Sequence, residues 1–371
     1  WSQFESECMT VVQAQAIPIK LHYDIGGSKR TFAGIPRQME ILFIRIETDT
    51  GLIGWGEAFG LSIWPATRQA FEHLVAPLIM GKDEKDISRL MANLQKQLHI
   101  LGRTGAVTFA LSGLDIALWD IQGKAKQQSL SELLGGAKHQ SLPGYASLMR
   151  YGNTDLIKHN TERALEKGFT AIKLHEQSSE YVQAARQLMG PELPLMMDVN
   201  CPWSVAQTLE MLPQLHASNL LWLEEPIWPP EDFRGLKKIR DKRSIAIAAG
   251  ENNISTCHFE EMLAYGSVDF AQPSVTKIGG ITEMLKIMKL CQHFETPVMP
   301  HSPYFGPGLL ATLHLAAVLQ PETMIEYSFA DLGANPLGDC ILMRHGRIDI
   351  PRGPGLGCDP DLDILHEFRV P

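Results

Sequence analysis

The sequence predicts an α/β fold in which a closed parallel barrel of strands and helices follows a smaller N-terminal α+β domain. Eight short apolar runs, separated by amphipathic segments, follow one another from residue 142 onward. Three of these runs end in an acidic residue, Asp198, Glu224 and Glu251, with separations of 224 − 198 = 26 and 251 − 224 = 27 residues. One strand, one helix and two loops fill such an interval, which is the repeat of a parallel βα barrel. The length of 371 residues leaves room for a barrel and one smaller domain.

The α+β domain is expected to cover residues 9–137. Two runs, 11–23 and 39–58, alternate apolar and polar residues, which predicts antiparallel strands with Asp49-Thr50-Gly51 as a hairpin turn. From about residue 67 to 133, apolar residues recur at helical spacing, and the domain closes near Gly135-Gly136. Residues 1–8 have no strand or helix period and are left out of the predicted fold.

The barrel is expected to cover residues 138–345. No glycine-rich loop of the dinucleotide or P-loop type follows any of its apolar runs, which argues against an open nucleotide-binding sheet. The tail, residues 346–371, is rich in Gly, Pro and Asp and is expected to pack back on the first domain. The eight predicted strands are 142–148, 169–175, 193–200, 220–226, 245–252, 268–274, 296–301 and 323–328.

Composition excludes several classes of partner. The net charge is −9 and no run of Lys and Arg occurs, so neither a nucleic acid nor an anionic membrane is an expected partner. Six scattered cysteines without a C-x-x-C pair are typical of reduced thiols in a cytoplasmic protein. No apolar run reaches the roughly 18 residues of a membrane-spanning helix, so a soluble protein is expected.

Polar residues gather at the ends of the predicted strands, where a parallel barrel brings side chains from all strands to one mouth. Three neighbouring carboxylates repel each other unless a cation lies among them, and oxygen ligands suit Mg²⁺. Each polar residue alone has a structural alternative, since a single histidine is more often structural than catalytic. Polar residues at seven consecutive strand ends favour a functional site. These residues are Lys173, His175, Asp198, Asn200, Glu224, Glu225, Glu251, Asn252, Ser274, His301 and Glu326.

The sequence resembles the enolase superfamily, in the subgroup of mandelate racemase and the acid-sugar dehydratases. The resemblance rests on TDTGLIGWGEA, ALSGLDIALWDIQGK followed by SELLGG, the Lys173-x-His175 pair, DVN, LEEP, GEN, KIGG and His301. It implies a modified (β/α)7β barrel of the TIM type with an N-terminal capping domain. It also implies one Mg²⁺ per subunit, held by Asp198, Glu224 and Glu251, beside a Lys or His base.

The resemblance further implies a role for each remaining residue. Lys173 and His175 take the acid/base position of strand two, with the pKa of Lys173 expected to be lowered by burial and Mg²⁺. His301 lies on the opposite face, and Glu326 hydrogen-bonds the substrate carboxylate. Asn200 is a polar contact near the metal.

Two regions are expected to adapt this scaffold to its own substrate. The family has an aspartate or a lysine at the end of strand six where this chain has Ser274, which disfavours a racemisation by two bases and leaves Ser274 as a substrate contact. Loops of the capping domain with Lys29, Arg30, Arg37 and Trp64 are expected to contact the far end of the substrate.

The predicted function is Mg²⁺-dependent removal of the proton α to a carboxylate through a metal-stabilised enediolate. Dehydration of a sugar acid to a 2-keto-3-deoxy acid is the main prediction. A racemase, epimerase or cycloisomerase on the same scaffold is the first alternative. A metal-independent glycoside hydrolase, with Glu224 or Glu225 and Glu251 as its carboxylates, is the second, and a non-catalytic descendant of the fold is the third. A small carboxylate substrate and a homo-oligomer, from dimer to octamer, are the expected partners.

Overall fold

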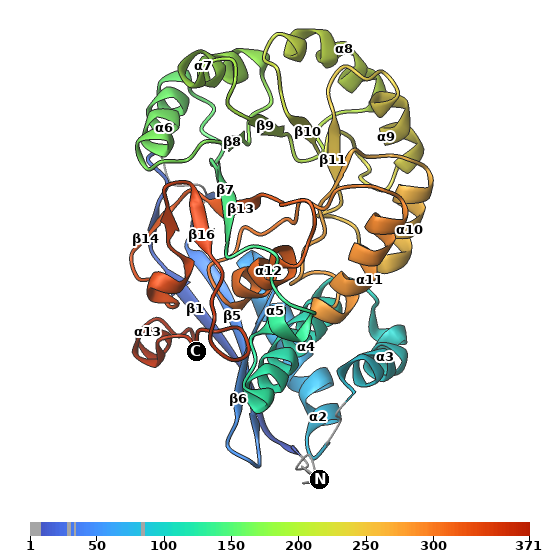
Figure 1. Ribbon diagram of the computed structural model, residues 1–371, viewed down its shortest axis with the longest axis vertical. Coiled ribbons are helices and arrows are strands. Elements are labelled where there is room, and N and C mark those ends of the chain that lie inside the picture. The colour runs from blue at the N-terminus through green and yellow to red at the C-terminus, as the bar shows by residue number, and fades with distance from the viewer. Residues whose placement is uncertain (1–8, 28–30, 33–34, 83–85) are drawn as a thin grey trace.

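The computed structural model describes residues 9–27, 31–32, 35–82 and 86–371. Lys29 and Arg30, which were expected in a substrate-contacting loop, lie outside the described residues. The chain forms a ring of strands and helices with an antiparallel sheet and its helices below it (Figure 1). The α/β fold predicted from the sequence, an N-terminal α+β domain followed by a TIM-type barrel, is confirmed.

The N-terminal sheet has three antiparallel strands in the order β1, β5, β6. The predicted hairpin turn joins β5 to β6, where Gly51 has a φ of 80° and donates its N–H to the carbonyl of Thr48. The main strands are β1 (Val11–Leu21), β5 (Met39–Thr48) and β6 (Ile53–Ala58), and short ones are β2 (Tyr23–Asp24), β3 (Thr31–Phe32) and β4 (Ile35–Pro36).

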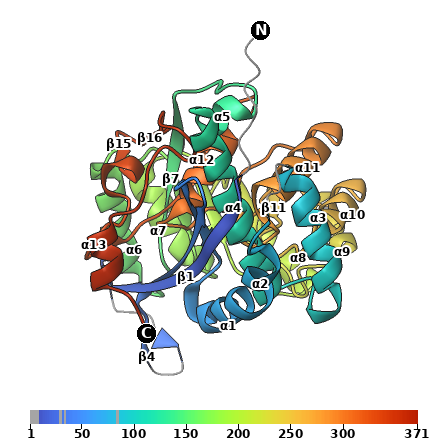
Figure 2. The same cartoon turned by 90° about the horizontal axis from the view of Figure 1, so that it is seen from below.

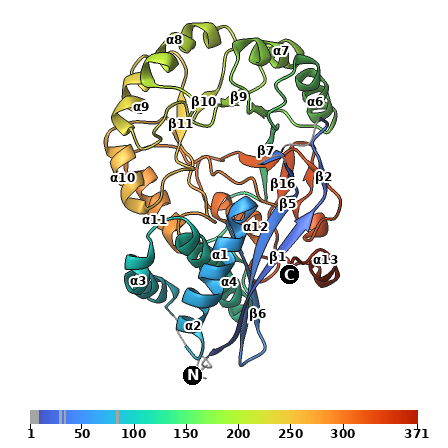
Figure 3. The same cartoon turned by 180° about the vertical axis from the view of Figure 1, so that it is seen from behind.

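Helices cover one face of this sheet (Figure 3). The long helix α4 packs on β6 so closely that a side chain at Gly56 would collide with the carbonyl oxygen of Gly113. The helical elements are η1 (Leu61–Ile63), α1 (Trp64–Ala70), η2 (Phe71–Val75), α2 (Ala76–Ile79), α3 (Ile87–Leu98), η3 (His99–Leu101), α4 (Ala106–Lys126) and α5 (Leu130–Leu133).

The two faces of the sheet bury different residues because strand side chains alternate. On β5, Leu42 and Ile44 pack against the helices of the N-terminal domain. Their neighbours Ile41 and Phe43 belong to the hydrophobic cluster that continues into the barrel. The domain and the barrel therefore share one apolar interface, which fixes the loops of the domain over the barrel mouth.

Seven of the eight predicted barrel strands form, and parallel pairing of β13 with β7 closes one side of the ring. The predicted strand 296–301, all of which the structure describes, forms a parallel bridge between Val298 and Ala271 and a few backbone hydrogen bonds to strand six, but no continuous strand. Pro297 and Pro300 lack the N–H groups that a ladder needs, which explains the difference. The strands are β7 (Ser141–Ser147), β8 (Ile172–Leu174), β9 (Leu195–Asp198), β10 (Trp222–Glu224), β11 (Ile247–Ala249), β12 (Phe270–Ala271) and β13 (Ile325–Ser328).

Helices surround the ring and connect successive strands (Figure 1). Most begin at a Ser, Asn or Asp whose side chain accepts a backbone N–H, as Ser204 does for α8 and Asn153 for α6. The helices are α6 (Thr154–Glu166), α7 (Ser179–Met189), α8 (Val205–His216), α9 (Phe233–Arg240), α10 (Thr256–Ala264), α11 (Gly280–His293) and α12 (Pro307–Ala317).

An apolar layer fills the barrel directly below the predicted site. Each of the eight predicted strands contributes at least one side chain to it, and aromatic contacts join Tyr145, Trp222 and Phe270. Two residues further along each strand, the side chains on the same face form the next layer. That next layer consists of Ser147, Lys173, Asp198, Glu224, Gly250, Gln272, His301 and Glu326.

The tail contacts both parts of the molecule. Strand β16 (Arg347–Asp349) pairs with the beginning of β7, and β15 (Met343–Arg344) extends the same sheet. At the very end, α13 (Leu362–Glu367) lies beside β1, where Arg369 bridges to Ile19 (Figure 2). Two further short elements are β14 (Asp331–Leu332), which pairs with β2, and η4 (Gly338–Ile341).

Two expectations based on composition, about the cysteines and about membrane-spanning helices, can be compared with the described residues. The five cysteines among them are free. None of the described helices has the length and apolar character needed to cross a membrane. The cytoplasmic location stays a prediction.

Candidate active site

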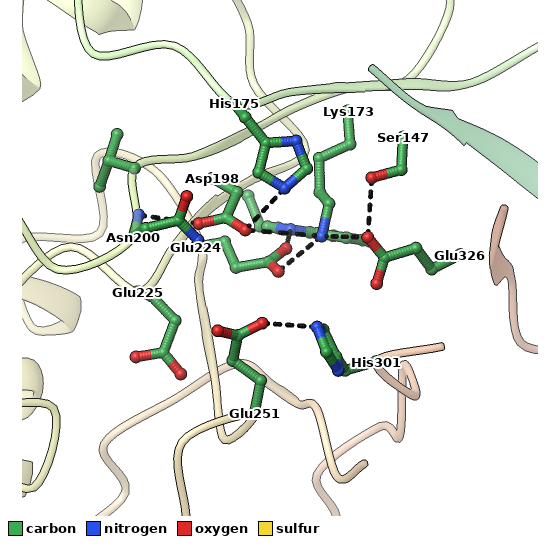
Figure 4. Close-up of polar contacts among 12 residues, drawn as sticks. Ser147, Lys173, His175, Asp198, Asn200, Glu224, Glu225, Glu251, His301 and Glu326 are labelled. Atoms are coloured by element: carbon green, nitrogen blue, oxygen red, sulfur yellow. Dashed lines mark hydrogen bonds and ion pairs between the residues drawn. The ribbon is translucent and has the colours of Figure 1, made fainter. Parts of the chain in front are cut away.

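Three carboxylates meet at the mouth of the barrel. Parallel pairing sets Asp198 beside Glu224, and Glu251 follows the next strand, β11. One oxygen from each of the three lies within 4.8 Å of the others (Figure 4). Asp198 and Glu224 are buried, and Glu251 is partly buried. The residues that the sequence proposed as metal ligands are therefore brought together by strand register.

Lys173 is fully buried among carboxylates on strand β8. Its Nζ lies 2.7 Å from Glu224 Oε1, 2.9 Å from Glu326 Oε1 and 3.7 Å from Asp198 Oδ2 (Figure 4). Burial opposes the charge of Lys173, but the attraction of Glu224 and Glu326 outweighs it and raises the pKa of Lys173 well above its ordinary value. The expectation of a lowered pKa included the charge of a bound Mg²⁺, so it stays a prediction for the metal-bound site.

His175 lies next to Lys173 and has different partners on its two ring nitrogens. Nδ1 is 2.6 Å from the backbone carbonyl oxygen of Leu148, which can only accept, so Nδ1 donates. Nε2 points toward the carboxylates and lies 3.2 Å from Asp198 Oδ2. Burial opposes a charge on the ring, but Asp198 outweighs burial and raises the pKa of His175.

His301 lies on the opposite side of the carboxylates from Lys173 (Figure 4). Its Nε2 is 2.7 Å from Glu251 Oε2, and its Nδ1 is 3.1 Å from the hydroxyl of Ser274. That hydroxyl is in turn hydrogen-bonded to the phenol of Tyr304. Burial would raise the pKa of Glu251, but the nearby His301 outweighs it and lowers that pKa.

Glu326 on β13 is the third buried acid within 4.0 Å of Lys173 Nζ, after Asp198 and Glu224. Its Oε1 also accepts the hydroxyl of Ser147 at 2.7 Å, and its Oε2 lies 3.3 Å from the N–H of Ser302. Burial would raise its pKa, yet the nearby Lys173 and His301 lower it to about 2. Glu326 is thus a carboxylate whose oxygens already have donors.

The second acid of the LEEP motif faces away from Lys173. Glu225 adopts a φ of 45°, and its oxygens accept the N–H of Gly250 and the thiol of Cys201 at 2.9 and 3.4 Å. Burial raises the pKa of both Glu224 and Glu225 to about 7. Only Glu224 of this pair therefore contributes to the three-carboxylate cluster.

The donor set fits a divalent cation. Five buried or partly buried carboxylates lie in this part of the barrel with three cationic or potentially cationic side chains, which leaves two negative charges when all are ionised. Oδ2 of Asp198 is buried and has an ion-pair contact with His175 but receives no hydrogen bond of good geometry from the described residues. Such an oxygen is suited to a hard cation such as Mg²⁺. The carboxylates are Asp198, Glu224, Glu225, Glu251 and Glu326, and the others are Lys173, His175 and His301.

A cavity of about 250 Å³ opens beside these groups between the barrel and the N-terminal domain. Arg37, Glu40 and Leu61 line it from the N-terminal domain, and Asn200 lines it from the barrel. The amide oxygen of Asn200 lies 3.3 Å from Nη2 of Arg150. The proposed substrate contacts Arg37 and Asn200 therefore lie at the cavity.

Two residues proposed as substrate contacts do not line this cavity. Ser274 is fully buried behind the ring of His301, so the histidine separates it from the cavity. Trp64 donates its indole N–H to Glu40 at 3.3 Å, and Glu40 is the residue that lines the cavity. A direct contact of Ser274 or Trp64 with the substrate therefore stays a prediction.

Sequence reasoning missed three residues of the site. Ser147 ends β7 and follows the same strand-end rule that identified the others, so the signal was present. Glu57 is an acid inside the apolar run GWGEA, a pattern that indicates a buried carboxylate. Tyr304 lies in the segment after His301 and has no sequence signal of its own.

Comparisons with known families agree with this geometry. Residues 156–364 match the family model described as "Enolase C-terminal domain-like", and residues 30–135 match "Mandelate racemase / muconate lactonizing enzyme, N-terminal domain". The chain belongs to the enolase superfamily. The resemblance inferred from the sequence motifs is therefore confirmed.

Characterised members of the superfamily cover most of this chain. The chain is similar to D-galactarolactone cycloisomerase of Agrobacterium fabrum, with 31% identity over 89% of this chain and 91% of that protein. It is equally similar to arabinonate dehydratase of Saccharolobus solfataricus, with 31% identity over 89% of this chain and 91% of that protein. The crystal structure of 3,6-anhydro-D-galactonate cycloisomerase from Zobellia galactanivorans superimposes with a TM-score of 0.85 at 28% identity, covering 98% of this chain and 100% of that one.

Proposed function

We propose that this enolase-superfamily chain is a Mg²⁺-dependent enzyme that removes the proton α to a carboxylate and eliminates water from a sugar acid, giving a 2-keto-3-deoxy acid. The observation that carries the proposal is the convergence of Asp198, Glu224 and Glu251 between two sets of proton-transfer groups. Lys173 and His175 lie on one side of them and His301 on the other. Relatives that are named dehydratases and cycloisomerases support the same class of chemistry.

Asp198, Glu224 and Glu251 would hold the cation. When bound, Mg²⁺ supplies positive charge that stabilises the negative charge developing on the substrate carboxylate as the α-proton leaves. Removal of that proton needs a base within reach of the α-carbon. The cavity beside the carboxylates is lined by His175 of strand two and His301 of strand seven, which supports a substrate bound between them.

The strand-two pair is the better side for the base. The hydrogen bond of His175 Nδ1 to a carbonyl leaves Nε2 as the nitrogen that exchanges a proton with a ligand in the cavity. Lys173 is held as an ammonium by Glu224 and Glu326 and supplies a positive charge beside the same site. On the far side, His301 is the group that faces a departing hydroxyl.

A cycloisomerase is the second candidate. Two observations favour it: a 31% identical relative is a D-galactarolactone cycloisomerase, and a structure with a TM-score of 0.85 is also a cycloisomerase. The two reactions share the loss of an α-proton and differ in the leaving group. In dehydration the product is lighter than the substrate by one water, whereas in cycloisomerisation the mass is unchanged.

A screen of sugar acids, their lactones and diacids tests the proposal. The purified protein is incubated with Mg²⁺ and each compound, 2-keto acids are detected as semicarbazones, and product masses are measured. We expect a semicarbazone and the loss of one water with at least one sugar acid, both abolished by EDTA and restored by Mg²⁺. Turnover of a glycoside that survives EDTA would instead favour the hydrolase alternative.

A further inference from the structure

Lys277 is the one lysine among the described residues that line the cavity, and it lies in the turn after β12. Its neighbours in the chain, Thr276 and Ile278, are 0% and 2% exposed, whereas Lys277 itself is partly buried. The turn is joined to the N-terminal domain, because the N–H of Phe59 donates to the carbonyl of Thr276 at 3.3 Å. The packing of both domains therefore fixes the position of Lys277 at the cavity.

The ammonium group of Lys277 has an aromatic neighbour but no acidic one. Its Nζ lies 5.2 Å from the centre of the Phe59 ring, a contact that favours a cation without offering it an oxygen. Among the residues that the structure describes, no carboxylate oxygen lies within 4.0 Å of this Nζ. Most lysines extend the ammonium into water, where it needs no partner. A partly buried ammonium, in contrast, is stabilised when an oxygen or an anion reaches it.

The four acidic residues that line the cavity do not supply this partner. Two belong to the carboxylates of the candidate metal site and of Lys173, and one is paired with Lys20 at 3.2 Å. The last is kept neutral at neutral pH by burial, which raises its pKa to about 8. In that order, the four acids are Glu251, Glu326, Glu40 and Glu57. The negative charge that would balance Lys277 therefore has to come from the ligand.

The chemistry of the ligand's free end decides how well it can balance Lys277. A sugar acid whose carboxylate lies at the three-carboxylate cluster extends the rest of its carbon chain into the cavity. In a sugar monoacid that chain ends in a neutral hydroxyl, whereas in a sugar diacid it ends in a second carboxylate. A hydrogen bond between an ammonium and a carboxylate is roughly twice as strong as one between neutral groups. The diacid is therefore the better match for this cavity.

We propose that Lys277 is a specificity-determining residue that binds the second carboxylate of a sugar diacid, so that diacids are the substrate class of this site. The inference rests on the proposed function and narrows its substrate class. A monoacid leaves the ammonium without a counter-charge and binds more weakly. Lys277 takes no part in the removal of the α-proton.

Three variants separate the charge of Lys277 from its size. Lys277→Met removes the ammonium and keeps an unbranched apolar chain beside Phe59. Lys277→Arg keeps a positive charge that can bind a carboxylate. Lys289→Met is the matched control, because it removes the charge of an exposed lysine on the neighbouring helix α11.

Binding is measured with pairs of sugar acids that differ only at the free end: galactarate with galactonate, and xylarate with xylonate. Calorimetry at saturating Mg²⁺ gives the Kd of each compound, and KM replaces Kd for a compound that is turned over. In the unmodified protein, at least one diacid should bind about tenfold more tightly than its matched monoacid, the effect of one hydrogen bond between charged groups.

The variants should change this preference selectively. Lys277→Met should weaken binding of the diacid about tenfold and leave that of the monoacid within about twofold. Lys277→Arg and Lys289→Met should each keep the preference for the diacid. Equal weakening of both compounds by Lys277→Met, or no weakening of the diacid, overturns the proposal.

An effect of Lys277 on the metal site has to be measured separately. Burial raises the pKa of Glu251, and His301 and then Lys277 lower it, so the charge of Lys277 acts on this proposed metal ligand through space. The affinity of each variant for Mg²⁺ alone is therefore determined by calorimetry before any sugar acid is added. Loss of the diacid preference in Lys277→Met that persists at saturating Mg²⁺ supports a direct contact with the ligand.

The same measurements distinguish a failure of this proposal from a failure of the proposed function. If diacids bind with the expected dependence on Lys277 but no 2-keto acid is formed from any compound, the proposed function fails and the role of Lys277 stands. If monoacids are turned over and no diacid binds more tightly than its matched monoacid, the proposed function stands and the role of Lys277 is wrong.

Discussion

Glu57 is a carboxyl group buried between the N-terminal domain and the barrel. It lies on β6, is 5% exposed, and its Oε2 accepts the N–H of Gly308 at 2.8 Å, at the beginning of α12. Burial raises its pKa from an ordinary 4.5 to about 8, and the hydrogen bonds from the backbone of Gly308 and Gly306 offset only part of that rise. Folded Glu57 is therefore protonated at neutral pH, whereas the unfolded chain is ionised there.

The different pKa values of Glu57 in the folded and unfolded chain make the free energy of unfolding depend on pH, and they fix the sign and size of that dependence. Between pH 4.5 and pH 8 the folded state binds a proton that the unfolded state has lost, so stability falls as pH rises through this window. The difference, 8 − 4.5 = 3.5, corresponds to about 5 kcal/mol as an upper limit. Glu57→Gln has nearly the same shape and no titration, so it should lack this slope.

Urea unfolding at pH 5 and pH 8, at one protein concentration, measures the effect. The free energy of unfolding of Glu57→Gln minus that of the unmodified protein is determined at each pH. From pH 5 to pH 8 this difference should rise by at least about 1.5 kcal/mol in favour of the variant. Glu166→Gln, at an exposed position near the end of α6, is the matched control and should show no such gain. If the two glutamine variants differ by less than about 0.5 kcal/mol in this gain, the assignment of a neutral buried Glu57 is wrong.

Three further predictions concern the metal, the base and assembly. Asp198→Asn should abolish Mg²⁺ binding by calorimetry and all turnover, with an unchanged circular dichroism spectrum, and binding as tight as in the unmodified protein would contradict the ligand assignment. Lys173→Ala should stop entry of solvent deuterium at the α-carbon because it removes the positive charge beside the base, whereas His301→Asn should retain exchange and lose product. The reverse pattern would place the base on the strand-seven side. Light scattering at micromolar concentration should give a mass well above the 41.3 kDa of one chain, and a mass near that value would exclude a homo-oligomer.

Most of the fold could be predicted because the sequence repeats one physical unit. Apolar runs at intervals of 26 and 27 residues predicted the barrel, and the acids at their ends predicted the cluster of Asp198, Glu224 and Glu251. The prediction of a continuous seventh strand was wrong, although the sequence already contained two prolines that argue against it. Pro297 and Pro300 remove two ladder donors from a segment of only six residues.

The details of the site could not be predicted, because they depend on distances across strands. The ends of β8, β10 and β13 place Lys173 within 2.9 Å of both Glu224 and Glu326, and these contacts raise its pKa, an effect that the sequence did not indicate. In the sequence, Ser274 could be interpreted only as the absence of the aspartate or lysine that the family has at this position. Only the structure shows that the hydroxyl of Ser274 is hydrogen-bonded to the phenol of Tyr304.

The two layers of the barrel explain why the chemistry and the specificity of this chain reside in different segments. The apolar layer of Tyr145, Trp222 and their neighbours is buried, and every strand continues from it by two residues to a polar side chain or a glycine. Lys173, Asp198 and Glu224 are thereby fixed by strands, not by loops. The far wall of the cavity comes instead from the segments around Arg37 and Leu61 in the N-terminal domain. A change in those segments reshapes the cavity without moving a carboxylate of the barrel layer, so the barrel can keep its chemistry while the N-terminal domain selects the ligand.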